Sequence, residues 1–324
     1  MMMAAMRKLG FVAVVLVLLP SLFMSSCHQD EQHPTNSFTV RAISVHGAPS
    51  RWDFAVQQGL VRIGEELGGG VESLRVTDSA DAGVRITEIG RQQVDLVFCI
   101  GGWFEKTRYT ESAAFPGTVF VLLPGNVRRG NVAGIQFLPE EAGYVAGAVA
   151  SVISSSNRVG VLRGEGQPWL ESVEEGFLAG FRANRRRAAV TTADGAEGAA
   201  ILASQGVGVA LYATDFAEPD VLAAARASGL KLVSTDRRVM VSDPDLVFAA
   251  VEIDVAEAMV RVAREVRDGV FSARVFAFDL GSGVVDVSLN GGLPDEVREE
   301  AVEALANARA EVTAGYVAFD ELGL

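Results

Sequence analysis

The sequence predicts an α/β protein whose mostly parallel strands form two similar, doubly wound sheets flanked by helices. Three observations carry this prediction. Short, continuously apolar runs recur along the chain, as expected for strands buried inside a parallel sheet. Glycine or proline follows most of these runs, and a segment with helical spacing of apolar residues comes next. The pattern occurs in two successive sets, residues 39–137 and 158–266, which is typical of doubly wound sheets.

The first strand, loop and helix form the clearest unit of the pattern. Residues 39–45 are β-branched and largely apolar, and the next helix repeats apolar residues at Val56, Leu60, Ile63 and Leu67. Trp52 and Asp53 lie where strand gives way to helix, at the carboxyl edge of the predicted sheet. Open α/β sheets bind ligands at that edge. The residues alone leave two interpretations of Trp52 open, a lid on the core or a stacking platform for a flat ligand.

The remaining elements follow in order along the chain. In the first set we expect strands at 71–76, 94–100, 118–123 and 132–137, and helices at 81–92 and 107–115. In the second set we expect strands at 158–162, 207–213, 230–234 and 246–253, and helices at 139–153, 170–181, 219–228 and 255–266. Residues 275–278 and 284–289 are expected to pair as a hairpin, and a last helix covers 294–310.

The helix at 139–153 carries small residues four positions apart. Proline and two acidic residues open it, as is common in the first turn of a helix. Gly143, Gly147 and Ser151 then lie on one side. Their spacing predicts close backbone approach to a neighbouring element.

Composition limits the function classes. The chain has 324 residues, nearly half of them apolar, which is enough for two domains or one large one. Its net charge is −13 and its pI is about 4.8. Nucleic-acid binding requires a basic surface, so nucleic acid is not an expected partner.

The N-terminal residues predict an export signal. Arg7 and Lys8 precede an apolar run over 9–24, and Met24-Ser25-Ser26-Cys27 resembles a bacterial lipoprotein cleavage box. We therefore expect a signal peptide at 1–26, a lipidated Cys27, and a polar tether at 27–37. The chain would then be anchored to a bacterial membrane and face the periplasm. An ordinary signal peptide with an incidental cysteine is the alternative.

The sequence offers little for catalysis. Only three histidines occur, two of them in the N-terminal tail, so His46 alone can belong to a fold. We find neither a metal-ligand cluster nor a nucleophile elbow, although acid–base work by a pair of carboxylates stays open. Cys99 lies in an apolar strand and is interpreted as a small core residue. We expect no catalytic residues, no metal and no cofactor.

Three tryptophans indicate where a ligand binds. Trp52, Trp103 and Trp169 are the only three, and each follows a predicted strand at the edge where ligands bind. Indoles give a flat ligand a large contact area. Further candidates from similar loops are Asp53, Asp215, Phe216 and Asp236. Each aspartate is equally well explained as a helix cap.

Three segments resemble a known family. FLPEEAGYVAGAVAS (137–151), RVGVLRGEGQP (158–168) and EGFLAGFRA (175–183) resemble the basic membrane protein family of ABC-importer lipoproteins, of the purine nucleoside receptor type. The resemblance implies a type I periplasmic-binding-protein fold with ligand in the cleft between two lobes and no catalytic activity. It also implies the division of the chain: lobe 1 comprises 38–137 and 254–275, and lobe 2 comprises 138–253 and 276–324.

The family's ligand-binding positions are only partly kept. Its stacking phenylalanine falls on Trp52, its asparagine on Asp53, and its aspartate on Asp236, whereas its lysine falls on Val251 or Glu252 and is missing. Two family carboxylates are replaced by Pro124 and Gly125.

These replacements, together with the three indoles, favour a wider aromatic ligand and a resemblance to the riboflavin-binding branch. The prediction is therefore a monomeric lipoprotein that binds riboflavin and delivers it to an ABC permease and its ATPase. A purine nucleoside is the alternative cargo. A hydrolase on an α/β scaffold and a surface-exposed interaction protein are the alternatives from other classes.

Overall fold

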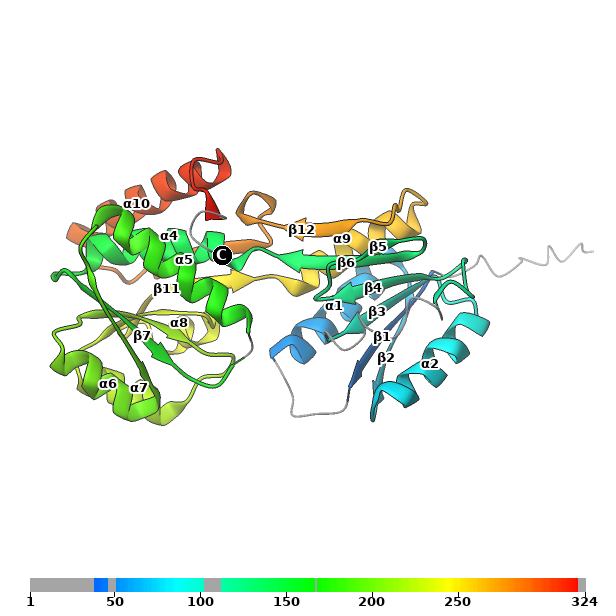
Figure 1. Cartoon of the computed structure of the whole chain (residues 1–324), viewed down its shortest axis with the longest axis horizontal. Coiled ribbons are helices and arrows are strands. Elements are labelled where there is room, and N and C mark those ends of the chain that lie inside the picture. The colour runs from blue at the N-terminus through cyan, green and yellow to red at the C-terminus, as the bar shows by residue number, and fades with distance from the viewer. Residues whose placement is uncertain (1–37, 46–50, 102–111, 167, 320–324) are drawn as a thin grey trace, which may run out of the picture. The chain divides into compact units, whose positions relative to one another are not determined.

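Two mostly parallel sheets, each flanked by helices, make up the described part of the chain (Figure 1). The structure is a computed structural model and describes residues 38–45, 51–101, 112–166 and 168–319. The predicted signal peptide, Cys27, the tether, His46, Trp103 and most of the helix expected at 107–115 lie outside the described residues.

The first sheet has the strand order β2-β1-β3-β4-β6-β12, and neighbouring strands in this order are parallel. Its strands are β1 (Thr39–Val45), β2 (Gly70–Val76), β3 (Leu96–Ile100), β4 (Val119–Leu123), β6 (Val132–Phe137) and β12 (Val275–Phe278), with β5 (Arg128–Arg129) antiparallel to β6. Helices α1 (Arg51–Leu67), α2 (Ser79–Arg91) and α9 (Val255–Arg267) pack on this sheet.

The second sheet repeats this order as β8-β7-β9-β10-β11-β13, and only the β11–β13 pair is antiparallel. Its strands are β7 (Arg158–Arg163), β8 (Ala189–Asp194), β9 (Val209–Ala213), β10 (Lys231–Ser234), β11 (Val247–Ile253) and β13 (Val285–Leu289). The accompanying helices are α4 (Pro139–Ile153), α5 (Trp169–Asn184), α6 (Gly195–Ser204), α7 (Pro219–Ala227), α8 (Arg237–Ser242), the short η2 (Leu280–Ser282) and α10 (Asp295–Thr313).

The apolar pattern explains the cores of both sheets. Every residue of β3 and of β9 is buried, as a central parallel strand requires. In α1 the four apolar residues at helical spacing are all buried and form one cluster with α9. Cys99 is 2% exposed and lies in a second apolar cluster of the same sheet.

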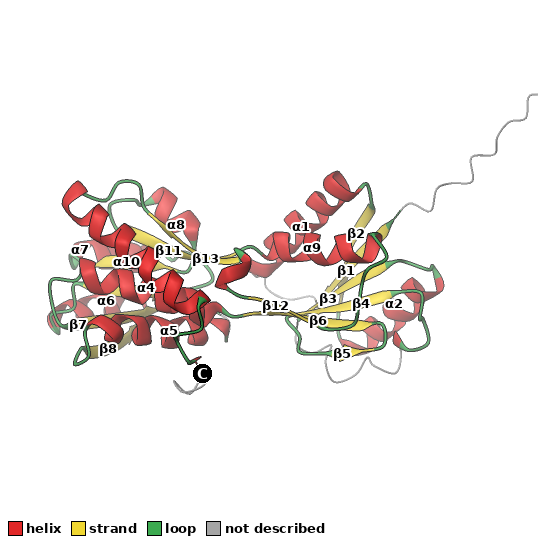
Figure 2. Cartoon of the chain, turned by 90° about the horizontal axis from the view of Figure 1, so that it is seen from above, coloured by secondary structure: helices red, strands yellow, loops and turns green. Residues whose placement is uncertain are grey.

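The predicted hairpin of residues 275–278 and 284–289 is wrong. β12 pairs with β6, in parallel and from Val275 opposite Gly134 to Phe278 opposite Phe137, whereas β13 pairs with β11. Figure 2 shows β6 and β12 side by side. Phe276 and Phe278 are each 7% exposed and are buried in the core of the first sheet. Residues 276–278, which the prediction gave to the second lobe, therefore belong to the first sheet.

Five elements of the structure were not predicted: β5, β8, α6, α8 and η2. β8 is an edge strand of alanine, threonine, valine and aspartate whose residues are mostly at least partly exposed. α6 is rich in alanine and has only a weakly one-sided apolar pattern. Small residues of this kind leave little of the periodicity on which a sequence-based assignment depends.

Helices α4 and α5 pack backbone to backbone. A Cβ atom on Gly147 would lie 1.9 Å from the carbonyl oxygen of Phe177, and one on Gly143 would lie 2.4 Å from that of Val173. The contact is reciprocal, because α5 presents its own Gly176 and Gly180 to α4. One turn further along, Ser151 Oγ accepts a hydrogen bond from Asn184 Nδ2 at 3.0 Å. The predicted close approach of this helix to a neighbour is confirmed.

Three connections join the two sheets: β6 to α4, β11 to α9, and β12 through η2 to β13. A hydrogen bond ties the first connection to the third. The backbone N–H of Leu280, in η2, donates to Glu141 Oε2 in the first turn of α4 at 2.8 Å. The pKa of Glu141 is raised above its ordinary value, chiefly by burial. The hydrogen bond from Leu280 lowers this pKa, and the nearby charges of Asp279 and Glu140 raise it. Burial also raises the pKa of Glu140.

These two glutamates predict a pH dependence of stability. Because their pKa values are higher in the folded state than the ordinary 4.5, the folded protein holds protons that the unfolded chain has already released. Their contribution to stability is therefore present below about pH 4.5 and is lost as the pH rises through the folded-state pKa values.

We expect the double variant Glu140→Gln/Glu141→Gln to lack this component. The difference in thermal midpoint between variant and wild type, measured from pH 4 to pH 8, should shift in favour of the variant as the pH rises. Glu257, whose pKa is lowered by Arg261 and Arg62, contributes with the opposite sign in both proteins and cancels in the difference. A difference that does not change with pH would contradict the prediction.

Candidate functional site

The strand order of each sheet contains one reversal. In the first sheet the chain turns from one side to the other between β1 and β3, and in the second sheet it does so between β7 and β9. Loops leaving the carboxyl ends of two such strands diverge and open a crevice, the usual ligand site of open α/β sheets. Trp52 lies in the first turn of α1, the helix after β1, and Trp169 begins α5, the helix after β7. Of the three tryptophans, Trp52 and Trp169 thus belong to connections that leave these reversal points, whereas Trp103 lies outside the described residues.

At the reversal point of the second sheet, Trp169 and Asp215 are hydrogen-bonded. Trp169 Nε1 donates to Asp215 Oδ1 at 3.0 Å, and this bond joins the start of α5 to the loop after β9. The indole is partly buried and packs against the core, whereas Asp215 is 2% exposed. The ring is therefore held in one orientation at the edge of the sheet. Phe216, the next residue, is 41% exposed at the same edge.

The two loops around this pair are fixed to each other by backbone bonds. Gly164 N–H donates to Ala213 O, and Asp215 N–H donates to Glu165 O, each at 2.9 Å. Packing at Gly164 is close, because a Cβ atom there would lie 2.9 Å from Thr214 Cβ, next to the backbone of the β9 loop. Little conformational entropy therefore remains to be lost at this edge when a ligand binds.

Buried Tyr212 of β9 also holds the loop after this strand in place. Its hydroxyl accepts a hydrogen bond from the backbone N–H of Glu218 at 3.1 Å. Burial raises the pKa of Tyr212 to about 12, so the phenol stays neutral and keeps its bonding role throughout the physiological pH range.

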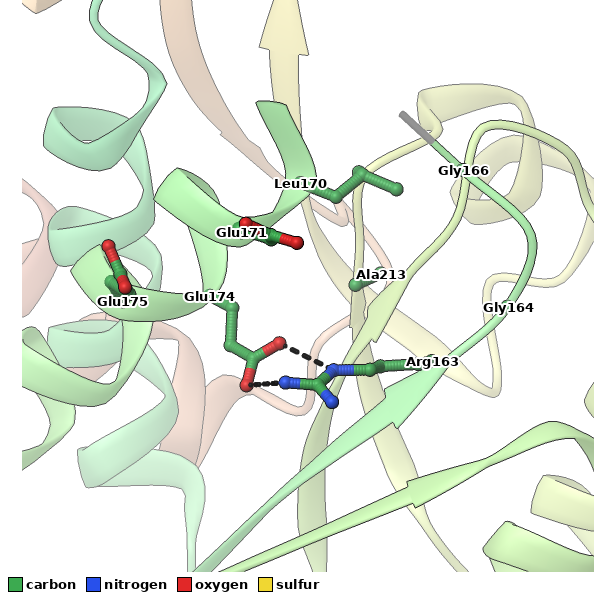
Figure 3. Close-up of a pocket in the computed structure, with 8 residues that line it drawn as sticks. All are labelled: Arg163, Gly164, Gly166, Leu170, Glu171, Glu174, Glu175 and Ala213. Atoms are coloured by element: carbon green, nitrogen blue, oxygen red, sulfur yellow. Dashed lines mark hydrogen bonds and ion pairs between the residues drawn. The ribbon is translucent and has the colours of Figure 1, made fainter. Parts of the chain in front are cut away.

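A pocket of about 320 Å³ lies beside the Trp169 loop, between the end of β7 and the first turns of α5 (Figure 3). Arg163 and Glu174 face each other in it and form a two-pronged ion pair, with Nε to Oε2 at 2.9 Å and Nη2 to Oε1 at 2.8 Å. These hydrogen bonds hold the pKa of Arg163 above its ordinary value. Glu171 and Glu175 add two further carboxylates, so the pocket offers mainly acceptors to a ligand.

Asp236 lies at the carboxyl end of β10, next to β9. It is 4% exposed and caps α8 by accepting from the backbone N–H of Arg238 at 2.9 Å. The Arg238 side chain binds the same carboxylate through Nε and Nη2. These hydrogen bonds hold the pKa of Arg238 above its ordinary value.

On the first sheet, Trp52 is partly buried in the first turn of α1. Its ring lies 5.4 Å from that of Phe137, measured between centroids, with the planes tilted by 46°. Asp53 follows it and is also partly exposed. Trp52 thus combines contact with the core and exposure at the edge, which leaves the interpretations as lid and as stacking platform both open.

Of the predicted site residues, the structure brings Trp169 and Asp215 into contact, with Phe216 directly beside them and Asp236 one strand away. Trp52 and Asp53 are at the corresponding edge of the first sheet. Sequence reasoning missed Arg163, Glu174 and Arg238. Arg238 follows a capping aspartate by two residues, which is a weak local signal, but nothing in the sequence pairs Arg163 with Glu174.

Two features are absent from the described residues. No group of three or more histidine, cysteine, aspartate or glutamate side chains is arranged there to hold a metal ion. No described helix has the length and apolar character needed to cross a membrane.

Comparison with known proteins identifies the family. The model of the Bmp family, described as ABC transporter substrate-binding protein PnrA-like, matches residues 48–314. The chain is a member of the Bmp family. Two curated proteins, the CD4+ T-cell-stimulating antigens of Listeria innocua and Listeria monocytogenes, are each 24% identical to the Bmp chain over 194 residues. That stretch covers 55% of this chain and only 54% of each relative, about half of their length.

Solved structures confirm the predicted fold class. A transcriptional activator of the comK gene from Bacillus halodurans superposes with a TM-score of 0.72 at 24% identity, covering 84% of the Bmp chain and 97% of its own. An ABC transporter solute-binding protein from Aeropyrum pernix superposes with a TM-score of 0.68 at 16% identity, covering 86% of the Bmp chain and 92% of its own. An ABC transporter solute-binding protein from Conexibacter woesei superposes with a TM-score of 0.68 at 17% identity, covering 87% of the Bmp chain and 98% of its own. The Bmp chain has the type I periplasmic-binding-protein fold.

Proposed function

We propose that this Bmp-family chain is the substrate-binding subunit of an ABC importer and that its cargo is riboflavin or a related flavin. The observation that carries the proposal is the Trp169 indole, fixed by its 3.0 Å hydrogen bond to Asp215 at the reversal point of the second sheet. An indole held in this way is a rigid platform for a planar ring. Stacking of aromatic rings contributes about 0.5–1.5 kcal/mol beyond the burial of surface.

A second platform on the first sheet supports the proposal. Trp52 rests on Phe137, and the Phe137 ring is in turn stacked on Phe278 at 6.1 Å. In the proposed mechanism the lobes close over the cargo by hinge motion, so that Trp52 and Trp169 approach its ring system from opposite sides. Trp103 would add a third indole. Asp53 and Phe216 would meet the ribityl chain and the ring edge, respectively.

The position of the missing family lysine favours a flavin over a nucleoside. One of its two candidate positions, Val251, is fully buried in β11, and the other, Glu252, carries the opposite charge and accepts a hydrogen bond from Ser288. A cargo that depends on a cation from β11 is therefore disfavoured. A purine nucleoside remains the second candidate, because Trp52 and Asp53 occupy the family's stacking and amide positions.

The proposal extends to the surroundings of the protein. Lipid on Cys27 would anchor the chain to the bacterial membrane, facing the periplasm, and the polar segment 27–37 would let the folded part reach an ABC permease with its ATPase. Intact protein mass spectrometry after expression in a bacterium with lipoprotein processing tests the anchor. A mass that lacks residues 1–26 and carries acyl chains would support it.

Titration with riboflavin tests the cargo. We expect purified protein to quench flavin fluorescence with one site per chain and to carry flavin when it is isolated from a flavin-containing medium. Binding of inosine or guanosine with no response to riboflavin would instead support the nucleoside. Recovery of chemically unchanged ligand after long incubation distinguishes a receptor from a hydrolase.

A further inference from the structure

The carboxylate of Asp236 is already engaged within the protein. Arg238 Nε lies 3.0 Å from Oδ1 and 3.1 Å from Oδ2, and Arg238 Nη2 lies 2.7 Å from Oδ2. The backbone N–H of Arg238 adds a fourth contact at 2.9 Å from Oδ1. A carboxylate has about four lone-pair positions for donors. With its side chain 5% exposed, Asp236 has little capacity left to accept a hydrogen bond from a ligand.

The guanidinium of Arg238 is, by contrast, presented to the outside. Its side chain is 61% exposed, and its Nη1 makes no hydrogen bond with any residue that the structure describes. A guanidinium carries five donors and no acceptor. Asp236 holds this group in one orientation through a two-pronged contact, so the donors on Nη1 are already positioned.

A second cation lies next to it. Arg237 has a side chain that is 62% exposed, and its nearest anionic partner is Glu252, 3.6 Å away. Both arginines lie in the first turn of α8, which only Thr235 and Asp236 separate from the carboxyl end of β10. β10 neighbours β9, whose loop carries the Asp215 that binds Trp169. The edge of the second sheet thus has an aromatic part at β7 and β9 and a hydrogen-bond-donating part at β10.

We infer that Arg238, not Asp236, contacts the cargo at the end of β10, and that it selects a cargo with acceptor oxygens at this position. The inference rests on the proposed function and deepens it. Acceptor oxygens can come from the ring carbonyls of a flavin or an oxopurine, or from a phosphate ester on the cargo. Asp236 then acts as a positioning residue for the guanidinium, and Arg238 determines specificity.

Binding to riboflavin and to its 5′-phosphate, FMN, tests the inference. Arg238→Met should weaken binding of at least one of them about tenfold or more, as expected when a hydrogen bond from a charged donor is lost. Arg238→Lys, which keeps a cation but loses the fork, should bind with intermediate affinity. The matched control is Arg226→Met, because Arg226 also forms an ion pair, with Asp243, and its side chain is 57% exposed. It lies in the last turn of α7, at the other end of that helix from the β9 loop.

Each outcome has a defined meaning. An equal loss for riboflavin and FMN assigns the ring carbonyls, and a loss confined to FMN assigns the phosphate; either result supports the inference. Unchanged affinities relative to Arg226→Met overturn it. So does an Asp236→Asn variant that loses as much affinity as Arg238→Met while Arg238→Lys binds normally, because the carboxylate would then be the contact group.

The flavin assignment can be overturned independently of the inference about Arg238. A wild-type protein that binds inosine but neither flavin overturns the flavin assignment. The effect of Arg238→Met on inosine affinity then tests the inference, because the inosine ring also carries a carbonyl. A wild-type protein that binds none of the three probes overturns both.

A measurement on the wild-type chain avoids any folding defect of the variants. Phenylglyoxal modifies exposed arginines, and the rate at each arginine can be followed by peptide mass spectrometry. The bound probe should slow modification of Arg238 severalfold and leave Arg226 unaffected. Equal rates at Arg238 with and without probe would overturn the inference.

Discussion

Replacing Gly147 by alanine is expected to lower the free energy of unfolding by about 3 kcal/mol or more. The added Cβ atom would lie 1.9 Å from the carbonyl oxygen of Phe177 and 2.8 Å from the backbone nitrogen of Phe181. Both are backbone atoms, so no side chain can rotate away to make room, and the two helices must separate. Gly180→Ala should have a similar effect, because its Cβ would lie 1.9 Å from the carbonyl oxygen of Tyr144.

Thermal denaturation of the purified variants measures this effect. A loss of 3 kcal/mol corresponds to a decrease in Tm on the order of 6–12 °C for a domain of this size class. Gly64→Ala is the matched control, since Gly64 also lies inside a helix but a Cβ there would meet its nearest atom at 3.6 Å. That substitution should raise stability by up to about 1 kcal/mol through helix propensity. Equal Tm values for Gly147→Ala and Gly64→Ala would show that the α4–α5 interface accommodates the methyl group.

The second large effect is expected at Trp169. Trp169→Ala should weaken riboflavin binding more than tenfold, because it removes both the stacking surface and the donor to Asp215. Trp169→Phe keeps an aromatic ring but cannot donate to Asp215, so its affinity should lie between those of Trp169→Ala and the wild type. The order of the three dissociation constants, measured by flavin fluorescence, separates stacking from orientation.

Because Trp169 also packs against the core, a control must account for lost packing. Phe271 is another partly buried aromatic residue, stacked on Phe276 at 6.2 Å before the amino end of β12. Phe271→Ala should lower Tm without changing the dissociation constant. If Trp169→Ala lowers Tm in the same way and binds riboflavin as tightly as the wild type, Trp169 is a core residue and the flavin proposal loses its main support.

The local pattern of apolar residues predicted the elements that are largely buried in the structure. β3 and α1 were predictable because a continuous apolar run and a one-sided apolar face each have a single structural solution. Close approach of a neighbouring backbone to Gly147 was also predicted from the spacing of the small residues, but the sequence did not identify α5 as that neighbour. β8 and α6, built of small residues, gave no comparable signal.

The contacts of the candidate site depend on distant parts of the chain. The rule that parallel strands end at one edge was enough to place Trp169 and Asp215 at the same edge of the sheet. Their hydrogen bond, however, joins residues 46 positions apart, and its geometry depends on how the two loops pack. The same is true of β12, whose partner β6 precedes it by more than a hundred residues. The sequence pattern contains no information that selects β6 over the nearby β13.

The late position of β12 and α9 in the chain has a consequence during synthesis. A nascent chain that ends before residue 255 has made β6 but lacks both α9, which packs on α1, and β12, which pairs with residues 134–137 of β6. The first sheet then has an unprotected edge and an uncovered apolar helix face, both of which favour association with other chains. Truncated products that contain β6 but end before residue 255 should therefore aggregate. Products that extend past residue 278 can complete the first sheet.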